Sequence, residues 1–247
     1  MPSLNFIILI GGPGKIASCD PAHDQTWKNY IAPIQVAVRK EKIVAPGERL
    51  HWWVYAPAYR ERWDDDSKAR ATQTQRKEVA AIRALHANDY LDRIQRAASG
   101  AGASFKALEK PNDFWVELGK LPDGSVSRVW YIGHASMDGL MLKLIHFGAC
   151  SPGADRDHDM IPLNAIRKNE PLVGRKLYRH GQPSKFLGCT TRAFAEQWRN
   201  VFKLTAEGAT AKIDFSVTNR PSKVEIIERL EKSEPTTGWT AFPAGAQ

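Results

Sequence analysis

Short apolar runs alternate with segments of helical periodicity along this chain, and that alternation most restricts its fold. Residues 5–10 and 50–55 are mostly apolar runs typical of buried strands. Between them, residues 25–39 place apolar side chains at every third or fourth position, which indicates an amphipathic helix. Strands that alternate with helices form a largely parallel sheet with helices on both faces. We therefore predict an α/β fold, a three-layer α/β/α sandwich with a mostly parallel central sheet.

The rest of the chain continues the pattern without a clear linker. Residues 60–77 are polar and predict an exposed insertion or the solvated start of a helix. Further helices are predicted over 78–98, 113–118, 162–168 and 193–203, and further strands over 127–134, 140–144, 184–189 and, at an edge, 211–217. The end of the chain is rich in Pro, Thr, Gly and Ala. We predict one domain over residues 1–233 and a flexible C-terminal tail over residues 234–247.

Composition restricts the partners and the compartment. The apolar run 6–10 is too short to span a bilayer and has no basic flank, so we expect a cytoplasmic protein with no membrane partner. A signal-independent secretion system could still export it. The formal charge of +8 favours acidic surfaces in general. However, Lys and Arg are mixed with acidic residues, as in residues 60–66, and this mixture does not favour nucleic acid.

Two of the predicted strands end in a reactive side chain. Residues 129–134 (VWYIGH) end in His134, and residues 186–191 (FLGCTT) place Cys189 just after an apolar run. The carboxyl ends of parallel strands meet at one edge of the sheet, where such folds place their sites. A histidine and a cysteine delivered there are the minimum equipment for thiolate catalysis.

Cys189 lies between a predicted strand end and a predicted helix start. The positive end of the helix dipole favours a thiolate there, and Thr190 or Thr191 could cap the helix through a hydroxyl. Both reactive residues also have structural interpretations, since a free cysteine is commonly a small buried hydrophobe and His134 could bond a loop carbonyl. Cys150 follows another candidate strand and is the rival nucleophile, although no clear helix begins after it.

The two segments resemble the catalytic motifs of the caspase-like cysteine peptidases, a group that includes caspases, metacaspases, gingipain- and clostripain-type enzymes and bacterial toxin self-processing domains. In that family one strand ends in His-Gly, and a later strand ends in the catalytic Cys, followed by small polar residues and a helix. Two positions depart from the family pattern: Ala135 replaces the usual Gly, and Gly188 replaces the Ala of many members. The resemblance implies a caspase-like fold.

The resemblance also implies a function, that of a cysteine endopeptidase with a His134–Cys189 dyad, similar to bacterial toxin or effector members. Cys189 would attack a peptide carbonyl and His134 would protonate the leaving amine. The backbone N–H groups of Ala135 and Cys189 would form the oxyanion hole. Such an enzyme takes a protein or peptide substrate and needs no metal or organic cofactor. A toxin of this kind would have a cognate inhibitor or immunity protein as a further partner.

The loop after the first strand contains Asp20, His23 and Asp24. In caspase-like proteins this region helps to build the pocket for the residue before the cleaved bond, so we assign these three residues to substrate binding. An aspartate there would favour a basic side chain, whereas Lys15 would favour an acidic one. The alternatives are a metal site serving a basic metal-dependent nuclease or other hydrolase, and simple capping of the next helix by Asp24.

Two other interpretations remain open at this point. The segment 151–159 contains Asp155, Asp157, His158 and Asp159, whose carboxylates suit Ca²⁺, but it lacks the glycine and terminal Glu of a recognised calcium loop. We interpret it as a solvated loop. The alternative to an enzyme is a non-catalytic caspase-like module that binds a protein partner.

Overall fold

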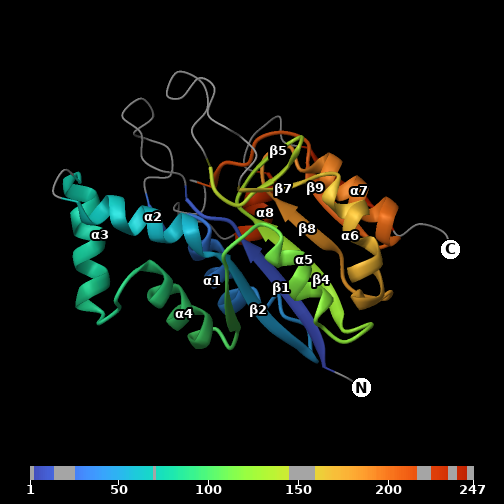
Figure 1. The fold of residues 1–247 in the computed structure, drawn as a ribbon, viewed down its shortest axis with the longest axis horizontal. Helices are drawn as coiled ribbons and strands as arrows, with labels where there is room; N and C mark the ends of the chain where they lie inside the picture. Colours follow the sequence, from blue (N-terminus) through green and yellow to red (C-terminus); the bar gives the residue numbers. More distant parts are fainter. Residues whose placement is uncertain are drawn as a thin grey trace.

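A seven-stranded sheet forms the centre of the computed structural model, which describes residues 3–13, 26–68, 71–144, 159–215, 224–232 and 238–243. Its strand order is β10-β9-β8-β4-β1-β2-β3 (Figure 1). The strands are β1 (Leu4–Ile10), β2 (Glu48–Tyr55), β3 (Ser104–Leu108), β4 (Val126–Ile132), β8 (Ser184–Leu187), β9 (Ala206–Ala209) and β10 (Trp239–Phe242). All neighbouring pairs are parallel except β9 and β10, which are antiparallel.

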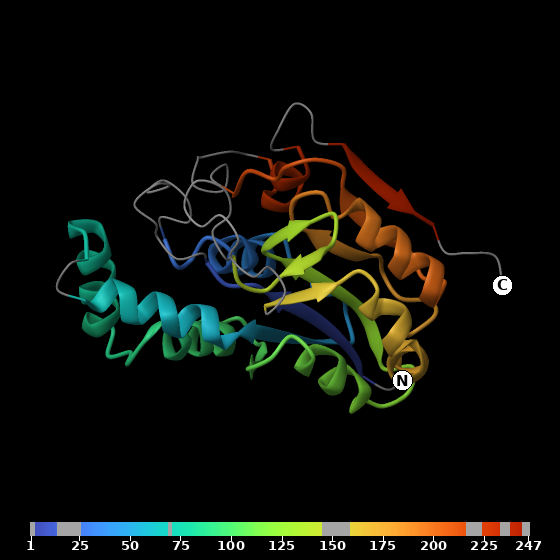
Figure 2. The ribbon, with the colours of Figure 1, turned by 45° about the horizontal axis from the view of Figure 1, so that its top comes forward.

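Helices cover both faces of this sheet (Figures 1 and 2). One apolar cluster joins the sheet to α1 (Ile31–Lys40), α4 (Tyr90–Gly100) and α8 (Ile226–Glu231). A second cluster, on the opposite face, joins it to α5 (Asp113–Gly119), α6 (Ala165–Val173) and α7 (Arg192–Phe202). The prediction of an α/β fold with a mostly parallel sheet between helical layers is confirmed.

The alternation of side chains along the strands explains why both clusters exist. Phe6, Ile8 and Ile10 of β1 belong to the first cluster, and Ile7 and Leu9 belong to the second. Successive side chains of a strand point to opposite faces, so a strand between two helical layers must be apolar throughout. The continuous apolar run that identified β1 in the sequence is therefore a direct consequence of its central position.

A small antiparallel sheet follows β4 directly. It consists of β5 (His134–Ser136), β6 (Gly139–Met141) and β7 (Met160–Pro162), in the order β5-β6-β7. A hydrogen bond of 2.7 Å from the Gly12 amide to the Leu142 carbonyl ties this sheet to the chain that leaves β1. The predicted strand after the Asp138-Gly139 turn exists, but it belongs to this second sheet rather than to the central one.

The polar segment 60–77, predicted to be an exposed insertion or the solvated start of a helix, is largely helical, but it is partly buried rather than solvated. It contains α2 (Ala56–Ser67) and the start of α3 (Gln73–Ala84). The side chains of Arg62 and Asp66 of α2 are 1% exposed and form an ion pair, in which the Arg62 Nε donates to both carboxylate oxygens at 2.9 Å. The hydroxyl of Tyr90 and the side-chain amide of Gln75 each donate to Asp66 at 2.7 Å. Charges can be buried here because they lie one helical turn apart and are hydrogen-bonded.

Three other predicted elements differ from the structure. The single helix predicted over 78–98 is two helices, α3 and α4, with a break at His86, where φ is 54°. No strand forms over the described residues 211–215 of the predicted edge strand, because β9 pairs with β8 in its place. Residues 239–242, inside the segment predicted to be a flexible tail, form β10 against β9. Neither β3 nor β9 was identified from its short, partly polar sequence.

Candidate active site

The strands that end near His134 and Cys189 are neighbours, as predicted. β4 and β8 are parallel, and Ile132 pairs with Leu187 at their carboxyl ends. The Gly133 amide donates to the Leu187 carbonyl at 3.2 Å, so both chains leave the sheet at the same level. His134 and Cys189 therefore occupy equivalent positions beyond two adjacent strands, and both are partly buried.

Gly188 is needed for the close approach of these two chains. A Cβ placed on Gly188 would lie 2.9 Å from the Gly133 carbonyl oxygen and 2.8 Å from the Ala135 Cβ. A backbone oxygen cannot yield easily, so even an alanine would push the two strand ends apart. The glycine at position 188 thus has a steric reason. The same contact brings Ala135 next to the chain that carries Cys189.

Two tyrosines hold His134. The Tyr30 hydroxyl lies 2.6 Å from the His134 Nε2, and the two rings pack edge to face with centroids 5.3 Å apart. The Tyr131 hydroxyl donates to the carbonyl of His134 and also lies 2.7 Å from the Met141 carbonyl. Burial raises the pKa of Tyr131, with smaller contributions from Cys189 and Tyr59, so its hydroxyl stays protonated as a donor. His134 is fixed through both its ring and its backbone.

Cys189 is held by a different segment. The Ile213 amide donates to the Cys189 Sγ at 3.5 Å, and the amide of Thr190 donates to the Ala211 carbonyl at 2.9 Å. Thr190 has a φ of 54°, a left-handed conformation that is an outlier for a β-branched residue. Such strain is typical of functional sites, where the surrounding structure over-determines the backbone. The strained residue directly follows the candidate nucleophile.

Thr191 locks the turn between Cys189 and α7. Its side chain is fully buried, and its hydroxyl donates toward the carbonyls of Phe186 at 2.5 Å and Gly188 at 3.1 Å. The same hydroxyl accepts the amide of Ala209 at 3.1 Å. The prediction that Thr190 or Thr191 caps α7 through its hydroxyl is therefore wrong: Thr191 is the N-cap residue but makes no side-chain cap, because its hydroxyl ties β8 to β9.

The segment 211–215 connects the surroundings of the two reactive residues. Ile213 contacts Cys189, and the Phe215 ring packs on Tyr30 with centroids 4.8 Å apart. Tyr30 in turn contacts His134. The hydrogen bonds described for the two reactive side chains thus lead to Tyr30 and to Ile213 rather than to each other. Sequence analysis missed these contacts, because Tyr30 follows a helical apolar pattern and Ile213 contributes a backbone group.

Several residues assigned from the sequence lie outside the described part of the chain. These are the substrate-binding candidates Asp20, His23 and Asp24, the neighbouring Lys15, the rival Cys150, and Asp155, Asp157 and His158. Asp159 is described: it accepts from the Tyr55 hydroxyl at 2.6 Å and lies 3.5 Å from the Lys143 Nζ. Among the described residues, no group of three His, Cys, Asp or Glu side chains is placed to hold a metal ion.

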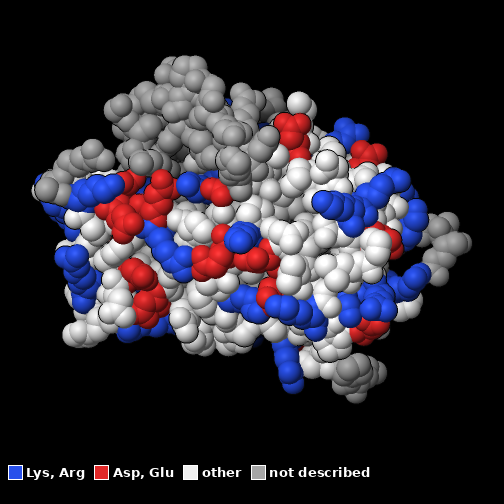
Figure 3. Space-filling view, viewed as in Figure 1, with Lys and Arg blue, Asp and Glu red and all other residues white. Residues whose placement is uncertain are grey.

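The surface and the comparisons with known proteins add little to this picture. Lys and Arg are interspersed with Asp and Glu over the face shown in Figure 3. In the described residues, no helix is both long enough and apolar enough to cross a bilayer.

The chain matches no known family model, and no curated protein sequence matches it significantly. A functional assignment must therefore start from the arrangement of the side chains themselves.

Proposed function

We propose that this protein is a cysteine endopeptidase of caspase-like type, with Cys189 as the nucleophile and His134 as the proton donor. One observation carries the proposal: β4 and β8 are adjacent and parallel and release Gly133-His134 and Gly188-Cys189 at the same level. The carboxyl edge of a parallel sheet is where α/β folds bind their ligands. The strained Thr190 after Cys189 further supports it.

The reaction would proceed in two steps. The Cys189 thiolate forms a bond to the carbonyl carbon of the peptide, and the C–N bond breaks as His134 transfers a proton to the leaving amine. The backbone N–H groups of Ala135 and Cys189 would stabilise the oxyanion between these events. Water then attacks the thioester, releases the acid product and leaves a proton on His134.

Substrate binding by Asp20, His23 and Asp24 is proposed from the described residues that flank them in the chain. Gly11, at the start of this region, donates its amide to the Ile132 carbonyl at 2.9 Å, and Tyr30, after it, contacts His134. Both described flanks of the loop therefore adjoin the β4 end. An aspartate from this loop would select a basic side chain before the cleaved bond. A toxin or effector role belongs to the same proposal through the resemblance alone.

Labelling with a peptidyl acyloxymethyl ketone tests the proposal. Probes with a basic or an acidic side chain before the reactive ketone are incubated with the full chain, and the modified residue is mapped by mass spectrometry. We expect modification of Cys189 by the basic probe and none in Cys189→Ala. Cys19 and Cys150 serve as internal controls for general thiol reactivity. Modification of those two residues with Cys189 left unmodified would contradict the proposal and favour a binding module.

A further inference from the structure

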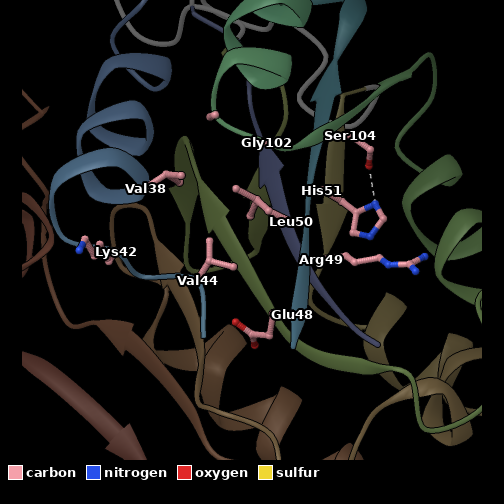
Figure 4. Close-up of a pocket in the computed structure, with 10 residues that line it drawn as sticks. Val38, Lys42, Val44, Glu48, Arg49, Leu50, His51, Gly102 and Ser104 are labelled. Carbon is pink, nitrogen blue, oxygen red and sulfur yellow. Dashed lines mark hydrogen bonds between the residues drawn. The ribbon is translucent and has the colours of Figure 1, made fainter. Parts of the chain in front are cut away.

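A second group of chemistry-bearing side chains lies at the opposite edge of the same sheet, where β1, β2 and β3 begin. Asn5, His51 and Ser104 lie on these three neighbouring strands, and His51 pairs directly with Ser104 in the parallel register. The Ser104 Oγ lies 2.6 Å from the His51 Nδ1, which Figure 4 shows as a dashed line. The His51 Nε2 lies 2.8 Å from the Asn5 Oδ1. The three side chains form a continuous hydrogen-bonded chain.

The hydrogen bonds of Asn5 determine which atom donates and which accepts in each hydrogen bond among these three side chains. The Asn5 Nδ2 donates to the carbonyl and the hydroxyl oxygen of Ser125 at 3.2 Å and 3.1 Å, so the Oδ1 must face His51. An amide oxygen can only accept, so His51 carries its proton on Nε2. The Nδ1 is then an acceptor for the Ser104 hydroxyl. Asn5 thus orients the imidazole and fixes its tautomer, which is the role of the third member of a hydrolytic triad.

The protonation state of His51 suits a general base. Burial lowers the pKa of His51, and the positive charges of Arg49 and Lys106 lower it further. The imidazole is therefore neutral at neutral pH, and its Nδ1 can take the serine proton.

Ser104 is accessible to a ligand. It is exposed, and β3 is the outermost strand of the sheet at this side. Ser104, His51 and Arg49 are among the residues that line a cavity of about 680 Å³ where β2 and β3 begin. Figure 4 shows Arg49 and His51 side by side on the same side of β2, with Val38, Val44 and Leu50 on the other side.

The charge that this site offers to a ligand is positive. Glu48, the acidic residue of the lining, forms an ion pair of 2.7 Å with Arg128 and accepts the Ser127 hydroxyl at 2.6 Å. Arg49 is exposed, and within the described residues its guanidinium has no acidic partner. A guanidinium next to the base can stabilise a developing oxyanion or bind an anionic group of the substrate.

We propose that Ser104, His51 and Asn5 form a second hydrolytic site, which cleaves small carboxylic esters that carry a negative charge. The Ser104 Oγ bonds to the ester carbonyl carbon while its proton moves to the His51 Nδ1. The carbon–alkoxide bond then breaks, and the alcohol leaves with that proton. Water attacks the acyl-serine, its proton passes through His51 back to Ser104, and the carboxylic acid is released. This site is independent of the His134–Cys189 site, because its residues lie on β1, β2 and β3, whereas His134 and Cys189 follow the carboxyl ends of β4 and β8.

A fluorophosphonate probe and two chromogenic esters test this site on the full chain. The probe bonds its phosphorus to an activated serine oxygen and releases fluoride. We expect it to label Ser104 in the wild type and in Cys189→Ala, and the labelling rate to fall at least about 100-fold in His51→Gln. The matched control is Ser99→Ala, which changes an exposed serine on α4 whose hydroxyl donates to the Gln95 carbonyl, and it should leave the rate unchanged.

The esters examine the substrate class. Hydrolysis of 4-nitrophenyl hemisuccinate, which is anionic, should disappear in Ser104→Ala and persist in Cys189→Ala. Arg49→Gln should raise the KM for the hemisuccinate roughly fivefold to tenfold and leave the KM for 4-nitrophenyl acetate unchanged. Failure of the probe to label Ser104, or hydrolysis that persists in a folded Ser104→Ala variant, would overturn the proposal and assign the three residues a purely structural role. Neither result bears on the peptidase.

Discussion

The two edges of the central sheet differ in how they hold a nucleophile and a histidine. At the amino edge, Ser104 and His51 lie within strands and hydrogen-bond each other directly at 2.6 Å. At the carboxyl edge, His134 and Cys189 lie just beyond β4 and β8, with His134 as the first residue of β5 in the small sheet, and their described hydrogen bonds involve Tyr30 and Ile213. Side chains within a strand are fixed by the pleat and the register. Cys189 lies in no strand and is held by the neighbouring segment 211–215, so its position depends on contacts outside the sheet.

The strongest way to separate the two edges is to remove each nucleophile in turn. Cys189→Ala should lower peptide cleavage by about 10⁴-fold or more, because it removes the proposed nucleophile. Ser104→Ala should leave peptide cleavage unchanged, and it is the matched control. Rates are measured with fluorogenic peptides that carry a basic or an acidic residue before the cleaved bond. Equal activity of wild type and Cys189→Ala would end the peptidase interpretation.

A substitution at Tyr30 tests how much the carboxyl edge depends on a neighbouring loop. Tyr30→Phe keeps the ring contact with Phe215 but removes the hydroxyl at 2.6 Å from the His134 Nε2. We expect kcat to fall roughly 10- to 100-fold, with a displaced pH profile and little change in KM, because His134 loses its orientation. Tyr178→Phe, at a tyrosine packed beside His180, is the control. A fall in kcat without any change in the pH profile would indicate a structural role only.

Thr191 and Ser125 allow a comparison of how strongly each edge is held together. Thr191→Val removes a fully buried hydroxyl that serves Phe186, Gly188 and Ala209, leaving the Ala209 amide unpaired. The free energy of unfolding should fall by about 1–3 kcal/mol. Ser125→Ala removes one of the two acceptors of the Asn5 amide, and the loss should be about 0.5–1.5 kcal/mol. Urea unfolding of both variants gives the values; the reverse order would refute the proposed role of Thr191.

The smallest effect concerns the pH dependence of stability at the amino edge. The pKa of His51 lies below its ordinary value of 6.5 in the folded chain, chiefly through burial. Between these two values the unfolded chain binds a proton that the folded chain does not, so stability is lost as the pH falls below 6.5. His51→Gln lacks this titration. The difference in free energy of unfolding between wild type and His51→Gln should therefore narrow from pH 7.5 to pH 5.5, and a constant difference would contradict the shift.

Sequence analysis correctly predicted the strands that are buried on both faces. The run Phe6–Ile10 and the run 129–132 lie in central strands, where both faces must be apolar, so composition alone identified them. It failed for α2, where Arg62 and Asp66 look solvated but pair with each other in the interior. It also failed for β3 and β9, because short strands at or near an edge have no continuous apolar pattern.

The sequence by itself determined the alternation of strands and helices and the two strand ends that carry His134 and Cys189. Both are local properties, since hydrophobic periodicity and the glycines before these residues are visible along the chain. Only the tertiary structure decided that β4 and β8 are neighbours in register, that Tyr30 and Ile213 contact the reactive atoms, and that Asn5, His51 and Ser104 meet. These contacts join residues between 24 and 104 positions apart, and strand order and register, which no local pattern encodes, bring them together.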